Sequence, residues 1–170
     1  MDSDELVVDF LNKSRNYQHI LSTLPATKGK RMPPTPYNTS GLLQSACNSI
    51  RMSPNDVMKY CQVLYQDGYI TYMRTESTKY SREFIEKVRD YIKTQGAGVA
   101  SEKSLPPDTE RNSLPHEAIR PTNISIVELP GNDKKLKSLY SLIWKNSLAS
   151  CMAPEQYMLY EYRVSAPDNL

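Results

Sequence analysis

Four segments of the chain repeat apolar residues at the spacing of an amphipathic α-helix, which limits the fold to a mainly helical one. The expected helices cover residues 40–52, 53–68, 81–94 and 132–152. The second has the clearest end signals, with Ser53 as N-cap, Pro54 at the first helical position and Gly68 just past the last turn. A 170-residue chain with 39% hydrophobic and 24% charged residues is also long enough to bury a core.

The two ends of the chain have a different pattern. The stretch "LVVDFLN" (residues 6–12) is rich in strand formers, and "MLYEYRVS" (residues 158–165) alternates apolar and polar residues. We expect these two stretches to pair as a ribbon, so that everything between them is an insertion. The basic, proline-rich stretch "PATKGKRMPPTPYNTS" (residues 25–40) has no periodicity, and we expect a phosphate-facing loop there.

Charge and cysteine content place few limits on function. A formal net charge of +2 is too small to demonstrate a nucleic-acid partner and does not exclude one. The three cysteines lie far apart, which suggests reduced thiols in a cytosolic protein. No signal peptide or long apolar run is present, so we expect no membrane association.

The segment after Gly68, "GYITYMRTEST", is expected to form a strand. Two helices joined by a tight turn and followed by a strand are the layout of a winged helix-turn-helix. Alternation along a strand places Ile70, Tyr72 and Arg74 on one face, and Tyr69 with Met73 on the other, where Tyr69 packs. A phenol beside a guanidinium suits attack on a phosphodiester. The alternative is a packing tyrosine beside a surface arginine.

Several motifs in order resemble one enzyme family. The stretches "PPTPYNTSGLLQSA", "LYQDGYITYMRTEST", "HEAIRPT" and "LYSLIWKNSLASCMAP" span most of residues 33–154 and resemble type IA DNA topoisomerases. The forms "YMRT" and "HEAIRP" are similar to the bacterial topoisomerase I branch, because the topoisomerase III branch tends to have proline in place of Met73.

The resemblance implies roles for single residues. Tyr72 becomes the nucleophile that is linked to the 5′ phosphate of a cut single strand. Arg74 binds the scissile phosphate and helps to activate or orient Tyr72, and His116 contacts the same phosphate region. A free phenol has a pKa of about 10, so such a nucleophile needs nearby cations or a base. The family usually has aspartate at the position of Glu76.

Further residues are candidates for DNA binding. They are Thr75, Arg120 and the basic residues Lys28, Lys30 and Arg31. Arg120 stands four positions after His116, which would align the two side chains on a helix, although Pro121 disfavours helix at the preceding residue. For His116 the alternative is a structural histidine that caps a turn.

No metal site is expected in this chain. It has no DxD motif, and Asp56, Asp67, Glu76 and Glu117 are scattered carboxylates that suit helix caps and surface charges. The resemblance implies that Mg²⁺ is bound by a toprim domain that this sequence lacks. We therefore expect a fragment that is inert alone, needs the remainder of the topoisomerase chain, and acts as a monomer on single-stranded DNA in the cytoplasm, associated with the nucleoid.

The predicted fold class is mainly α within α+β, a winged-helix-like helical domain with short strands, flanked by two strands of a gate domain. The expected division is an N-terminal arm of the gate domain (1–32), a catalytic-tyrosine domain (33–154) and a return strand (155–170). Two alternatives remain open: a non-catalytic winged-helix module that binds DNA through its basic loop and exposed tyrosines, and a structural α-domain that mediates protein contacts.

Overall fold

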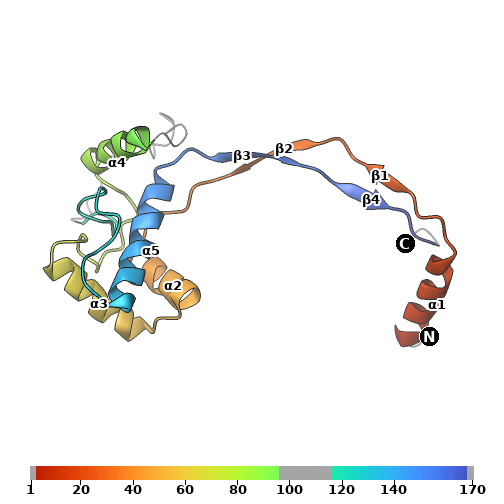
Figure 1. The fold of residues 1–170 in the computed structure, drawn as a ribbon, viewed down its shortest axis with the longest axis horizontal. Helices are drawn as coiled ribbons and strands as arrows, with labels where there is room; N and C mark the ends of the chain where they lie inside the picture. Colours follow the sequence, from red (N-terminus) through yellow and green to blue (C-terminus); the bar gives the residue numbers. More distant parts are fainter. Residues whose placement is uncertain (1–2, 96–115, 168–170) are drawn as a thin grey trace. The chain divides into compact units, whose positions relative to one another are not determined.

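The computed structural model describes residues 3–95 and 116–167 and divides the chain into two compact units. Unit 1 consists of Met1–Arg31 and Gln156–Leu170, and unit 2 of Met32–Glu155. The described part mixes helices with small sheets (Figure 1). Most of the loop predicted over residues 95–115 lies outside the described residues.

Unit 1 joins one helix to a ribbon of short strands. Its elements are α1 (Ser3–Arg15), β1 (Leu21–Thr23), β2 (Thr27–Arg31), β3 (Glu155–Leu159) and β4 (Tyr162–Val164). Strand β1 pairs antiparallel with β4, with Leu21 opposite Val164, and β2 pairs with β3. Unit 2 is therefore inserted between paired strands, as expected, although the strand partners differ from the prediction.

The strand predicted over residues 6–12 is wrong, because these residues lie in α1. Acidic side chains stand in its first turn and basic ones in its last, which suits the helix dipole. Lys13 also forms an ion pair with Asp9 one turn earlier, at 2.8 Å. These local electrostatic contacts accompany helix formation despite the β-branched residues in the middle of the segment.

The loop predicted over residues 25–40 is wrong in its first part, where β2 forms. Pairing with β3, which lies at the far end of the chain, gives this basic stretch its strand structure. Gly29 lies against the Tyr157 ring of the paired strand, so a Cβ added there would require that ring to shift. The return stretch is extended as predicted, but it is interrupted at Tyr160 and Glu161 and so forms two strands.

Unit 2 contains the four predicted helices. They are α2 (Thr39–Ile50), α3 (Pro54–Gln66), α4 (Arg82–Thr94) and α5 (Lys134–Ser150). Ser53 and Ser81 are the N-caps of α3 and α4, and Gly68 follows α3 with a φ of +76°. Helices α2 and α3 pack against each other and against α5.

The core of unit 2 is built on the buried stripe of α5. Leu139 and Ile143 are fully buried, and Trp144 donates from Nε1 to the Ile124 carbonyl at 2.8 Å. Trp144 is therefore a packing residue of this core. Cys61 and Cys151 are free thiols in this core, and burial raises their pKa values to about 12 and about 11.

The strand predicted after Gly68 forms no ladder. Ile70 makes an isolated bridge to Pro121, and the chain bends at Met73. Both of these residues are buried although they are three positions apart, so strict alternation fails between them. It resumes afterwards, with Thr75 and Ser77 buried and the residues between them exposed. Ile70 is thus buried while Arg74 is exposed, so the prediction that these two residues share one face is wrong.

Candidate active site

Two segments that are far apart in the sequence lie side by side in unit 2. Thr71 donates its backbone N–H to the Arg120 carbonyl at 2.9 Å, and Thr122 donates its own to the Tyr69 carbonyl at 3.0 Å. These bonds and the Ile70–Pro121 bridge join residues 69–71 to residues 118–122. Residues 116–122 are not helical, so the predicted alignment of His116 with Arg120 on a helix is wrong.

Pairing of these segments brings Tyr72 and His116 together. Their ring centroids are 5.2 Å apart with planes inclined at 48°. The Tyr72 ring also makes an edge-to-face contact with the ring of Tyr65 from α3, and the centroids of these two rings are 5.3 Å apart. The Tyr72 hydroxyl has no hydrogen-bond partner among the described residues, so its oxygen is not committed to the fold. Tyr65 was missed by the sequence analysis, since nothing in its helix marks it as a neighbour of Tyr72.

Arg74 is exposed on the outer side of the same segment. Within residues 3–95 and 116–167, no hydrogen bond or ion pair engages its guanidinium, whether with Tyr72, with His116 or with any other residue. The cation is therefore available to an external anion. Tyr69 instead packs inward, with its ring 6.2 Å from that of Tyr140, as predicted.

Thr75 belongs to the anchoring of this segment. It is only 7% exposed, and its hydroxyl accepts the Ser77 N–H at 3.1 Å. Thr39, the first residue of α2, accepts the Thr75 N–H at 2.9 Å and donates to the Met73 carbonyl at 2.8 Å. The side chain predicted to bind DNA is thus directed into the fold, and the Tyr72 segment is held on both sides of its bend.

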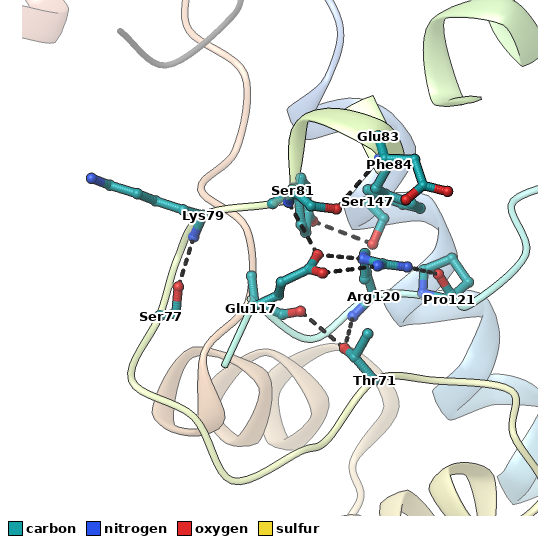
Figure 2. A network of polar contacts seen from close by, with 12 residues as sticks. Thr71, Ser77, Lys79, Ser81, Glu83, Phe84, Glu117, Arg120, Pro121 and Ser147 are labelled. Atoms are coloured by element: carbon teal, nitrogen blue, oxygen red, sulfur yellow. Dashed lines mark hydrogen bonds and ion pairs between the residues drawn. The ribbon is translucent and has the colours of Figure 1, made fainter. Parts of the chain in front are cut away.

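Arg120 is likewise engaged inside unit 2 (Figure 2). Its Nε and Nη2 donate to the two carboxylate oxygens of Glu117 at 2.8 and 3.1 Å, and its Nη1 donates to the Pro121 carbonyl at 3.1 Å. The guanidinium also lies 4.3 Å from the centre of the Phe84 ring. The side chain predicted to bind DNA is only 15% exposed.

Glu117 joins this ion pair to the start of α4. One of its carboxylate oxygens accepts the N–H of Ser81, the N-cap of α4, at 3.0 Å. Partial burial opposes ionisation of the carboxyl group, but hydrogen bonds from Arg120 and Ser81, with the Arg120 charge, outweigh it and lower the pKa of Glu117. Glu117 was expected only as a helix cap or a surface charge. In the structure its carboxylate accepts a hydrogen bond at the start of α4 and also forms an internal ion pair with Arg120.

The lowered pKa of Glu117 predicts an acid-dependent loss of stability. Because the folded pKa lies below the unfolded one, the stabilising contribution is complete above the unfolded value and is lost as pH falls through the folded value. We expect Glu117→Gln to lower the free energy of unfolding at pH 7 and the two proteins to converge toward acid pH. Denaturant titrations followed by the fluorescence of Trp144, the single tryptophan, measure this difference; a gap that is constant with pH would contradict the assignment.

The three remaining predicted DNA-binding residues lie in unit 1. Lys28, Lys30 and Arg31 are all exposed on β2. Lys28 and Lys30 are two positions apart on this strand and so share one face, while Arg31 shares the face of Gly29. Their exposure leaves these cations accessible to a polyanion.

Neither a metal-binding cluster nor a membrane-spanning helix occurs in the part of the chain that the structure describes. No three His, Cys, Asp or Glu side chains there are grouped so as to hold a metal ion. Asp67 is the C-cap of α3, and Asp56 lies in the first turn of α3, 3.5 Å from the Lys135 ammonium. None of the helices in residues 3–95 and 116–167 is long and apolar enough to cross a membrane.

One family of proteins matches both the sequence and the fold of this chain. Residues 1–169 match the family model for DNA topoisomerase. DNA topoisomerase 1 of Buchnera aphidicola subsp. Schizaphis graminum is 36% identical over 92% of this chain, and that of Haemophilus influenzae is 37% identical over 95%. These alignments cover 18% and 19% of the two relatives.

A solved structure agrees with the sequence relatives. Full-length topoisomerase I from Thermotoga maritima superposes with a TM-score of 0.74 at 30% identity, covering 99% of this chain and 28% of that one. The chain belongs to the bacterial type IA DNA topoisomerase family. It spans about a fifth of the length of the curated relatives that it matches.

Proposed function

We propose that the chain carries the nucleophile of a DNA topoisomerase that cleaves and religates single-stranded DNA. The Tyr72 oxygen attacks the phosphorus of a phosphodiester, forming a bond to the 5′ phosphate of the downstream strand. The bond from phosphorus to the 3′ oxygen of the upstream strand breaks, and that oxygen takes up a proton to become a hydroxyl. The reverse attack reseals the strand, and the phosphotyrosine linkage conserves the bond in between.

The observation that carries this proposal is the contact of Tyr72 with His116. Two motifs from distant parts of the sequence meet with their rings 5.2 Å apart, and the Tyr72 hydroxyl has no partner in the described part of the chain. In this proposal His116 contacts the phosphate that Tyr72 attacks. Arg74, exposed and without a protein partner among the described residues, binds the scissile phosphate once DNA is present.

Metal chemistry lies outside this chain in our proposal. The described carboxylates form no cluster that would hold Mg²⁺. A toprim domain elsewhere in the topoisomerase supplies the Mg²⁺ site, and without it the chain is inactive. The remainder of the topoisomerase and single-stranded DNA are the proposed partners of a monomer that acts in the cytoplasm, where its free thiols stay reduced.

The alternative is a winged-helix module that binds DNA without chemistry. The helix pair α2–α3 has the required tight turn, in which Arg51 adopts a left-handed φ of 54°. The segment that would form the wing has no strand ladder, however, and winged-helix binding gives no reason for the Tyr72–His116 contact. We therefore favour the catalytic proposal.

The test of the proposal is a covalent adduct with DNA. The chain is mixed with a toprim-bearing fragment of a related topoisomerase, Mg²⁺ and a single-stranded oligonucleotide labelled at either its 5′ or its 3′ end. A 5′-phosphotyrosine keeps the downstream piece, so we expect a denaturant-resistant adduct that carries the 3′ label and not the 5′ label. Omitting the toprim fragment or chelating Mg²⁺ should abolish it. Adducts that carry the 5′ label, or no adduct at all, would contradict the proposal.

A further inference from the structure

Arg120 stands where the Tyr72 and His116 segments meet, and its backbone holds the residue before Tyr72. The Arg120 carbonyl accepts the Thr71 N–H at 2.9 Å, and the Arg120 N–H donates to the Thr71 hydroxyl at 3.1 Å. The same hydroxyl donates to the Ala118 carbonyl at 2.9 Å. Thr71 is thereby fixed by three hydrogen bonds to residues 118–120, so any shift of Arg120 is passed to the neighbour of Tyr72.

The side chain of Arg120 holds the residue after His116. Its guanidinium donates two hydrogen bonds to the Glu117 carboxylate, and this carboxylate also accepts the Ser81 N–H at the start of α4. Phe84, on the first turn of α4, lies under the guanidinium (Figure 2). Contacts with α4 therefore fix the position of Glu117, and with it that of the neighbouring His116. Helix α4 is itself anchored in the core by four buried apolar residues, Phe84, Ile85, Val88 and Ile92.

These contacts also argue against a role in binding DNA. Three donor nitrogens of Arg120 are bonded within the protein, and the side chain is only 15% exposed. Turning the guanidinium toward a phosphate would break the fork and leave the partly buried Glu117 carboxylate without its cation. Arg74 in the same site is exposed and makes no such contact among the described residues.

We propose that Arg120 is a positioning residue, which through Glu117 and Thr71 sets the His116 ring against Tyr72 and does not itself contact DNA. The catalytic part of this inference rests on the proposed function. Its geometric part does not, because the distance between the two rings can be measured without any reaction.

The geometric test is nuclear magnetic resonance on the 170-residue chain, whose two histidines make the imidazole signals simple to assign. Arg120→Lys keeps the charge but loses the planar fork, and Glu117→Gln keeps the shape but loses the charge. In both variants we expect weaker nuclear Overhauser effects between the Tyr72 and His116 rings and a shifted His116 signal, with His19 unchanged. Arg82→Lys, which alters an exposed ion pair of α4 with Glu86, is the control that should change neither.

Unchanged ring contacts and an unchanged His116 signal in both folded variants would overturn the proposal. Trp144 fluorescence shows whether each variant is folded. If Arg120→Lys fails to fold, the milder Glu117→Gln decides the question, and Thr71→Val provides a second variant that removes only the two hydrogen bonds of the Thr71 hydroxyl.

The functional test uses the adduct reaction with the toprim-bearing fragment and Mg²⁺. We expect Arg120→Lys to slow adduct formation by about 10- to 100-fold, the range for a misplaced reacting group, with unchanged oligonucleotide affinity. If Arg120 contacted a phosphate directly, loss of its planar fork in Arg120→Lys would instead weaken oligonucleotide binding, which would overturn the proposal. If the wild-type chain forms no adduct, the proposed function fails, and the ring contacts alone decide the positioning role.

Discussion

Replacing Tyr72 with phenylalanine is expected to abolish covalent linkage to DNA while leaving the fold intact. The substitution removes the nucleophilic oxygen, and loss of a nucleophile lowers turnover by several orders of magnitude. It keeps the ring that packs against Tyr65 and His116, and the hydroxyl it removes bonds to no described residue. Adduct yield after denaturing electrophoresis, with the toprim-bearing fragment and Mg²⁺ present, measures the effect.

The matched control for this substitution is Tyr65→Phe. Tyr65 meets the same ring edge to face but has no assigned chemistry, so its variant should retain most of the adduct. Equal loss in the two variants would indicate that the ring cluster, and not the Tyr72 oxygen, is required. An undiminished adduct with Tyr72→Phe would show that another residue is the nucleophile.

A second large effect is expected in the core beneath the site. Ile143 is completely buried on α5, the helix against which α2 and α3 pack, so Ile143→Ala leaves a cavity. Substitutions of this kind cost about 2–5 kcal/mol, and we expect about 3 kcal/mol here. Denaturant unfolding followed by Trp144 fluorescence reports on unit 2, because this single tryptophan lies within it.

The control for the core variant is Val63→Ala on α3, where the side chain is 37% exposed. A change within about 0.5 kcal/mol is expected there, as for most surface positions. A loss below about 1 kcal/mol for Ile143→Ala would mean that α5 is not the centre of the core.

The helices of unit 2 could be predicted because their signals are local. Ser53, Pro54 and Gly68 mark the two ends of α3 within one stretch of sequence, and Ser81 marks the start of α4 in the same way. The stripe of α5 likewise follows from helical periodicity alone. Each of these features depends on residues within a few positions of one another.

Most errors in the predicted fold arise from contacts between residues that are far apart in the sequence, which local signals do not report. Strand β2 depends on pairing with β3, more than a hundred residues later in the chain. The bend at Met73, which buries it together with Ile70, depends on Thr39 and Pro121, and neither lies near it in sequence. The strand prediction for α1 gave too much weight to the strand preference of two valines. It gave too little weight to the charges at the helix ends and to an i,i+4 ion pair, which favour a helix.

The sequence motifs named candidate residues of the site, but they could not give the geometry around those residues. The family resemblance singled out Tyr72 and His116, and the structure brings these rings together. It could not reveal that Thr75 and Arg120 are directed inward, because burial depends on the contacts of Thr39, Glu117 and Phe84 across the fold.

The most direct test of the account is to identify the residue that is joined to DNA. The adduct is digested with nuclease and trypsin, and the peptide that retains a nucleotide is sequenced by mass spectrometry. Cleavage after Lys59 and Arg74 gives the peptide 60–74, which also contains Tyr60, Tyr65 and Tyr69, so fragment ions must assign the linkage. The account predicts a 5′-phosphate ester on Tyr72. A nucleotide on any other residue would contradict it.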